Sequence, residues 1–96
     1  MRYVVVHKMP AGMTRDDFIR LQKESQDDPN IKGIRSFINL SESKGVCILD
    51  APDKNALANW FKNKGVSYDS IFEVELEGER GKLVDLPVEV GAGTGI

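Results

Sequence analysis

The spacing of apolar and polar residues divides most of the chain into six short elements. Alternating or continuous apolar runs predict strands over residues 2–8, 31–40, 46–49 and 71–77. Apolar residues three and four positions apart predict helices over about 15–26 and 54–63. Thr14 and Asp17 resemble a capping box before the first helix, and Asp53 is a natural N-cap for the second. The predicted order is therefore β-α-β-β-α-β.

This order is typical of the ferredoxin-like split βαβ pattern, in the α+β class. Right-handed crossovers would place the first strand between the third and the fourth. We therefore predict an antiparallel sheet of order 4-1-3-2 with both helices on one face. Residues 1–77 form the expected domain, and residues 78–96 form a glycine-rich C-terminal extension that is partly extended or disordered.

The two sides of the predicted sheet differ in character, and we assign the more aliphatic sets to the helices. These residues are Val4, Val6, Phe72, Val74 and Leu76. The open face then receives Tyr3, Val5, His7 and Glu73. His7 and Glu73 are expected to be cross-strand partners. Two alternatives stay open for the second strand. The residues on the open face are either Ile34, Ser36 and Ile38, or Arg35 and Phe37.

An open face that mixes apolar and ionisable side chains suits a sheet-on-sheet homodimer that encloses a small polar cavity. The short length of the chain also favours a homodimer. A domain of 96 residues buries only about two-thirds of the surface that its unfolded chain exposes, so its core is thin.

Charge and composition exclude several classes of protein. A net charge of −2 argues against a nucleic-acid-binding protein, which normally carries a basic face. No apolar run approaches the roughly 18–20 residues of a membrane span, so we expect no membrane partner. The first residues reach a charge too early for a signal peptide. A single cysteine excludes an internal disulfide framework and favours a cytoplasmic location.

His7, the single histidine, is the first candidate for a site. It could bind a ligand or a metal, or act as a base held by Glu73; the alternative is a strand-end histidine hydrogen-bonded at an interface. Tyr3 and Glu73 share its predicted face and complete the candidate ligand-binding set. Cys47 has no second cysteine nearby, so it is a weaker metal candidate, and the alternative is a buried, inert thiol. No residue is assigned a catalytic role.

Residues 47–57 and 65–74 resemble a family of small bacterial and archaeal proteins often labelled nickel-binding protein. The matching features are a cysteine in the third strand, an Ala-Pro-Asp start to the second helix, and an Asp-x-Ile-x-Glu-Val start to the fourth strand. Residues 6–14, which include His7, resemble the family's first strand and turn. The similarity covers roughly residues 2–76.

The resemblance implies a ferredoxin-like fold paired into a dimeric α+β barrel, with nickel or another divalent metal bound at the barrel and His7 as the matching histidine. Many members carry a Glu-His pair in the second helix where this chain has Asn59 and Trp60. We therefore expect a small homodimer that binds a ligand or a metal, without catalysis. The alternative is a cofactor-independent enzyme, similar to monooxygenases or dehydratases, with His7 as its base.

Overall fold

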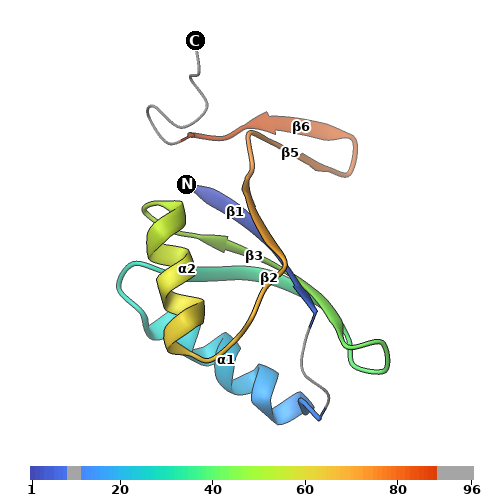
Figure 1. The fold of residues 1–96 in the computed structure, drawn as a ribbon. Helices are drawn as coiled ribbons and strands as arrows, with labels where there is room; N and C mark the ends of the chain where they lie inside the picture. The colour runs from blue at the N-terminus through green and yellow to red at the C-terminus, as the bar shows by residue number, and fades with distance from the viewer. Residues whose placement is uncertain (9–11, 89–96) are drawn as a thin grey trace.

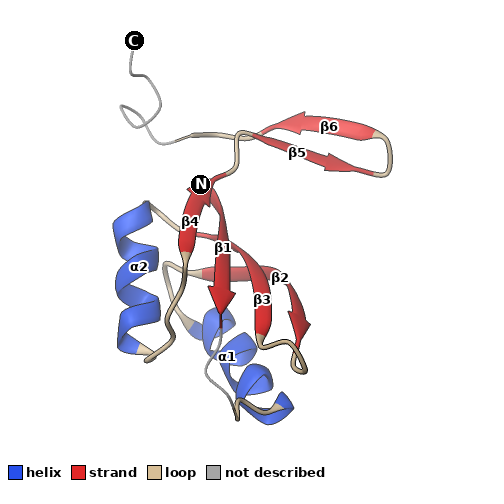
Figure 2. Cartoon of the chain, turned by 45° about the vertical axis from the view of Figure 1, so that its right-hand side comes forward, coloured by secondary structure: helices blue, strands red, loops and turns tan. Residues whose placement is uncertain are grey.

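The computed structural model describes residues 1–8 and 12–88, and it shows an antiparallel sheet with two helices packed on one of its faces (Figures 1 and 2). The elements of this unit are β1 (Arg2–Lys8), α1 (Arg15–Asp27), β2 (Lys32–Asn39), β3 (Lys44–Asp50), α2 (Lys54–Asn63) and β4 (Ser70–Glu73). The strands lie in the order β2-β3-β1-β4. The predicted order 4-1-3-2 is confirmed, because it is the same order counted from the other edge. Within the described residues, no helix is long and apolar enough to cross a membrane.

The helices begin where their capping residues predict. The Thr14 side chain accepts a hydrogen bond from the Asp17 amide, and the Asp17 carboxylate accepts one from the Thr14 amide at 2.8 Å. The Asp53 carboxylate accepts a hydrogen bond from the Ala56 amide at 2.7 Å at the start of α2. Each cap satisfies an amide that the first turn of a helix leaves without a partner.

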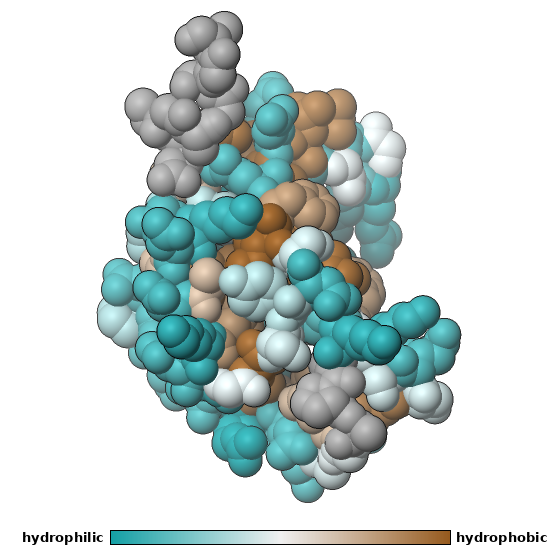
Figure 3. Space-filling view, viewed as in Figure 1, coloured by the Kyte–Doolittle hydropathy of each residue, from teal (hydrophilic) through white to brown (hydrophobic). Residues whose placement is uncertain are grey.

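The fourth strand is shorter than predicted and is followed by a separate hairpin. The strand β4 ends at Glu73, and Leu76–Glu79 (β5) pairs with Lys82–Asp85 (β6). Arg80 and Gly81 make the turn with φ angles of 49° and 83°. The hairpin stands beyond the sheet, next to the N-terminus, and carries apolar side chains at the top of Figure 3. The extension predicted from residue 78 thus begins inside this hairpin, and residues 89–96 lie outside the described residues.

The predicted assignment of faces in β1 and β4 is wrong. Tyr3, Val5 and His7 face the helices, with 1%, 0% and 4% of their surfaces exposed. Val4 and Val6, which alternate with them, therefore face the open side. In β4, Ile71 is 6% exposed on the helix side, whereas Phe72 is 52% exposed on the open face. Tyr3 and Val5 of β1 thus belong to the buried core, together with Leu57, Trp60 and Phe61 of α2.

A bulge between Gly33 and Arg35 decides the face of the second strand. Beyond the bulge Ser36 pairs with Cys47, and its side chain points to the helices. Arg35 and Phe37 therefore lie on the open face, where Phe37 is 58% exposed. The structure thus selects the second alternative for Arg35 and Phe37, but because of the bulge Ile34 of the first set also lies beside them on the open side.

The hydrophobic core lies between the sheet and α2. Its buried members are Tyr3, Val5, Ile31, Leu49, Ala51, Leu57, Trp60, Phe61 and Ile71. The helix α1 contributes none of these described residues, and its one buried side chain is Ser25, at 3% exposed. Phe18 and Leu21 of α1 are partly buried, and Ile19 is exposed.

Candidate functional site

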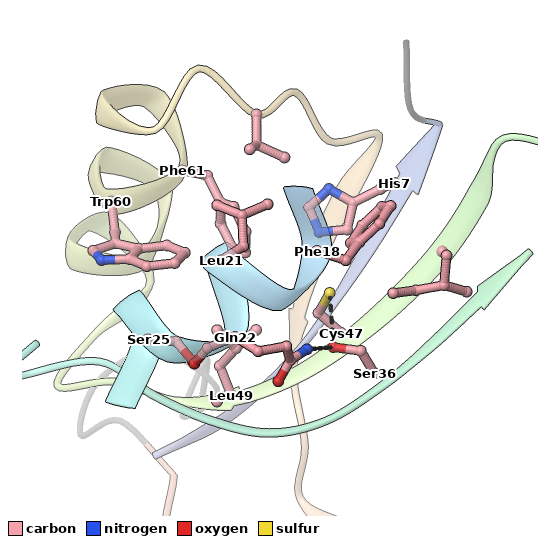
Figure 4. A pocket seen from close by; sticks show the side chains of 14 residues that line it. His7, Phe18, Leu21, Gln22, Ser25, Ser36, Cys47, Leu49, Trp60 and Phe61 are labelled. Carbon is pink, nitrogen blue, oxygen red and sulfur yellow. Dashed lines mark hydrogen bonds between the residues drawn. The ribbon is translucent and has the colours of Figure 1, made fainter. Parts of the chain in front are cut away.

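A pocket lies between α1, α2 and the helix-facing side of the sheet (Figure 4). Phe18 and Leu21 of α1 line one side of it. Its volume is about 40 Å³. That is room for more than one water molecule, each of which needs roughly 10–15 Å³. The side chains around it are mostly apolar, and those labelled in Figure 4 are His7, Phe18, Leu21, Gln22, Ser25, Ser36, Cys47, Leu49, Trp60 and Phe61.

His7 lies near the end of β1 and places its ring in this pocket. Its Nδ1 lies 2.8 Å from the carbonyl oxygen of Ser67, in the loop between α2 and β4. A carbonyl oxygen only accepts hydrogen bonds, so Nδ1 carries the proton, and the Nε2 of the neutral ring carries a lone pair. This Nε2 is buried, has no hydrogen-bond partner among the described residues, and is turned into the pocket (Figure 4). The edge of the ring packs against Phe61, with ring centres 4.9 Å apart.

The surroundings of His7 favour its neutral form. Burial is the largest effect and lowers the pKa of His7 below its ordinary value. The Ser67 carbonyl and the Asp69 carboxylate oppose it and raise the pKa by less. At neutral pH the imidazole is therefore uncharged, with Nε2 available as an acceptor.

Cys47 of β3 is the second titratable group in the pocket. It pairs with Val5, two positions from His7, so it is a diagonal neighbour of His7 on the same face of the sheet. Its sulfur accepts a hydrogen bond from Ser36 Oγ at 3.3 Å, and Ser36 Oγ in turn accepts one from Gln22 Nε2 at 2.7 Å. Burial raises the pKa of the Cys47 thiol, and the Ser36 hydrogen bond opposes this effect. Cys47 is therefore a protonated thiol at neutral pH.

Tyr3 and Glu73, the other two sequence candidates, lie at a distance from the pocket. They are direct cross-strand partners of each other, whereas β1 aligns His7 with Asp69, just before β4 begins. The predicted pairing of His7 with Glu73 is therefore wrong. Four residues of extended strand, about 13 Å, separate Tyr3 from His7. All three side chains share the helix-facing side of the sheet, but of the three only His7 lines the pocket.

Sequence reasoning missed the polar residues that flank Cys47. Ser36 could be placed on either face of the second strand; the isolated Gly33 was the one signal that a bulge could shift the register there. Gln22 lies on α1 beside Leu21, and nothing in the helical pattern distinguishes it from a solvated residue. Trp60 and Phe61 were recognisable as the apolar face of the second helix, and they form the pocket's aromatic wall.

The donor atoms at the pocket are few. Among the described residues, no three His, Cys, Asp or Glu side chains gather where they could hold a metal ion. His7 and Cys47 are the two such residues that line the pocket. Ser36 and Gln22 are neutral, and each is already engaged in a hydrogen bond.

Comparison with known proteins places the chain in a family. The family model described as nickel responsive protein SCO4226-like matches residues 3–74. The chain belongs to the SCO4226-like family. The crystal structure of SCO4226 from Streptomyces coelicolor A3(2) is similar with a TM-score of 0.67 and 20% sequence identity, over 81% of this chain and 100% of that one. At that identity the SCO4226 structure supports the fold alone, and a search of curated proteins found no significant match.

The family match confirms the resemblance inferred from the sequence. It includes β1 to β4 and therefore both sides of the pocket. It ends at residue 74, so the β5–β6 hairpin lies beyond the part that the SCO4226-like family model describes.

Proposed function

We propose that this protein is a small binding protein whose ligand occupies the pocket between α1 and the sheet, with His7 Nε2 as the atom that meets it. One observation carries the proposal: the His7 side chain is only 4% exposed, yet its Nε2 has no partner among the described residues. A buried polar atom without a partner costs about 1–3 kcal/mol. A ligand that bonds to Nε2 would remove this cost.

Nickel is the first ligand to consider, because the family is named for its response to nickel. His7 and Cys47 are the residues that would hold it, since imidazole and thiolate are good ligands for transition metals. Two such donors from one chain are too few for a complete nickel site, and burial keeps the Cys47 thiol protonated. The described residues therefore do not fit a resident nickel ion, and a small molecule fits the mostly apolar pocket better.

The position of His7 also argues against a metal site inside a barrel of two sheets. His7 faces the helices, so in a dimer paired through the open faces both sheets would separate one His7 from the other. A His7 metal site at the barrel face is therefore not part of our proposal. The proposed site lies within one protomer.

We propose in addition that the open face pairs with a second copy of the chain to form a homodimer of the α+β barrel type, in a cytoplasmic protein. Phe37 and Phe72 are more than half exposed on this face, beside Val4 and Val6. Leu83 of the adjoining hairpin is 69% exposed. An apolar patch of this kind is typical of a protein–protein interface.

The alternative function is a cofactor-independent enzyme of the monooxygenase or dehydratase kind, with His7 as its base. The neutral imidazole favours this alternative, because its lone pair could accept a proton. The pocket offers one other titratable side chain among the described residues, the Cys47 thiol, and no charged group. The residues of the pocket therefore fit ligand binding without catalysis better than they fit an enzyme.

Nuclear magnetic resonance of the ¹⁵N-labelled protein tests the proposal. Ethanol, acetonitrile and nickel chloride would each be titrated, and we expect the two organic probes to shift amide signals around the pocket. Leu21→Phe, which fills the pocket from α1, should abolish these shifts. Ile19→Phe, on the exposed side of the same helix, should leave them unchanged. Absence of pocket shifts with both organic probes would refute the proposal, and line broadening around His7 and Cys47 with nickel alone would favour a metal site instead.

A further inference from the structure

We propose that the ligand meets His7 with a hydrogen-bond donor: it is a compact neutral molecule that carries an O–H or N–H group on a small apolar body. The inference rests on the proposed function and deepens it. It follows from the direction of the hydrogen bond at the imidazole, from the uncharged side chains that line the pocket, and from the size of the pocket.

The loop between α2 and β4 fixes the imidazole as an acceptor. The Ser67 carbonyl lies 2.8 Å from Nδ1 and cannot donate, so it holds the proton on Nδ1. Nε2 then presents a lone pair to the pocket. A carbonyl or carboxylate oxygen from a ligand would place a second lone pair against it, whereas a hydroxyl or amine hydrogen would form the missing bond.

The groups that face His7 favour a neutral ligand. Phe61 of α2 packs against its ring, and the side chains that α1 and α2 present to the pocket are uncharged. β3 presents the Cys47 thiol, which burial keeps protonated. The one carboxylate that acts on His7 is Asp69, an exposed residue that does not line the pocket. A charged ligand would lose its hydration there without gaining an opposite charge.

The volume of the pocket sets the size of the ligand. About 40 Å³ exceeds the space for one water but is well below the roughly 150 Å³ of a cavity that holds a benzene ring. The occupant is therefore a molecule of a few heavy atoms, unless α1 moves outward. Phe18, Leu21 and Trp60 make the surrounding wall apolar, so the rest of the ligand is apolar as well.

Ethanol and acetonitrile give a matched test, because each has three heavy atoms but only ethanol donates a hydrogen bond. Titrations followed by amide shifts would measure both dissociation constants. We expect ethanol to bind about three- to tenfold more tightly, the effect of one hydrogen bond. His7→Phe, which keeps an aromatic ring but removes the acceptor, should abolish the preference. Tyr3→Phe removes a polar atom from the same face of β1 outside the pocket, and it should leave the preference intact.

A second measurement needs no variant. Two-bond ¹H–¹⁵N correlation spectra of the imidazole show which nitrogen carries the proton, and we expect Nδ1, with and without ethanol. A proton on Nε2 would overturn the inference. Equal affinity for the two probes would also overturn it while leaving the proposed function standing. Binding of neither probe would refute the proposed function, and this inference would fail with it.

Discussion

The substitution Gly33→Ala tests how α1 is held over the pocket. Gly33 lies in β2 directly beneath Ser25, the one buried residue of α1. A Cβ added at Gly33 would lie 2.5 Å from Ser25 Oγ and 3.3 Å from Ser25 Cβ. The first distance is too short for any stable contact. The hydroxyl must turn away, and it then gives up the 2.7 Å hydrogen bond that it donates to the Gln22 carbonyl.

The expected loss of stability is the difference between two opposing effects. Overpacking of a buried contact costs about 1–3 kcal/mol, which includes the disturbed hydroxyl. Replacing glycine by alanine restricts the unfolded chain and returns about 0.4–1 kcal/mol. We therefore expect Gly33→Ala to lower the free energy of unfolding by about 1–2 kcal/mol. In a Ser25→Ala background the Oγ is absent, and the added Cβ meets only the Cβ of residue 25 at 3.3 Å and Gln26 Nε2 at an ordinary 3.6 Å, so the same change at Gly33 should be nearly neutral.

Urea denaturation of the four proteins in this double-mutant cycle gives the coupling energy between the two positions. All four would be compared at one protein concentration, because the stability of a dimer depends on concentration. Gly78→Ala is the control, since its added Cβ would meet Leu83 at an ordinary 3.6 Å. A coupling energy within error of zero would show that Ser25 does not pack on Gly33 and would remove the basis for placing α1 over the pocket.

Three further predictions concern His7, Arg2 and Phe72. Burial lowers the pKa of His7 in the folded state, so the unfolded state binds more protons, and the free energy of unfolding should fall as the pH drops below about 6.5. Urea midpoints measured between about pH 5 and 8 should show this decrease, and His7→Phe should make it smaller. Arg2 Nη1 lies 2.7 Å from Glu77 at a partly exposed site, so Arg2→Met should speed hydrogen exchange in the β5–β6 hairpin while changing global stability by less than about 1 kcal/mol. Phe72→Lys should weaken the proposed dimer at least about tenfold in sedimentation equilibrium, whereas Ile19→Lys, which is 43% exposed on α1, should not.

The fold was predictable because its signals are local. Thr14 and Asp53 mark the starts of the helices through hydrogen bonds that span three residues, and both caps are present. The order of the elements then limits the sheet to one arrangement, because crossovers are right-handed. None of these steps requires knowing which side of a strand is buried.

The orientation of the strands was not predictable, because β1 and β4 are apolar on both sides. Val4 and Val6 are as suitable for a core as Tyr3 and Val5, so periodicity alone cannot show which side of the strand is buried. The choice depends on which set fits the space beneath α2, and that is a property of the assembled fold. The bulge after Gly33 also shifts the register of β2, and a single glycine in a strand suggests a bulge without showing which face the later residues take.

The corrected orientation changes the relation between the proposed site and the proposed dimer. With His7 on the open face, a second protomer would complete the site, and ligand binding would depend on dimerisation. With His7 beneath the helices, the sheet separates the pocket from the open face, and the two properties become independent. A monomeric Phe72→Lys variant should therefore bind ethanol with unchanged affinity, and a pocket filled by Leu21→Phe should leave the dimer intact. Loss of both properties together in either variant would mean that the pocket needs the partner after all.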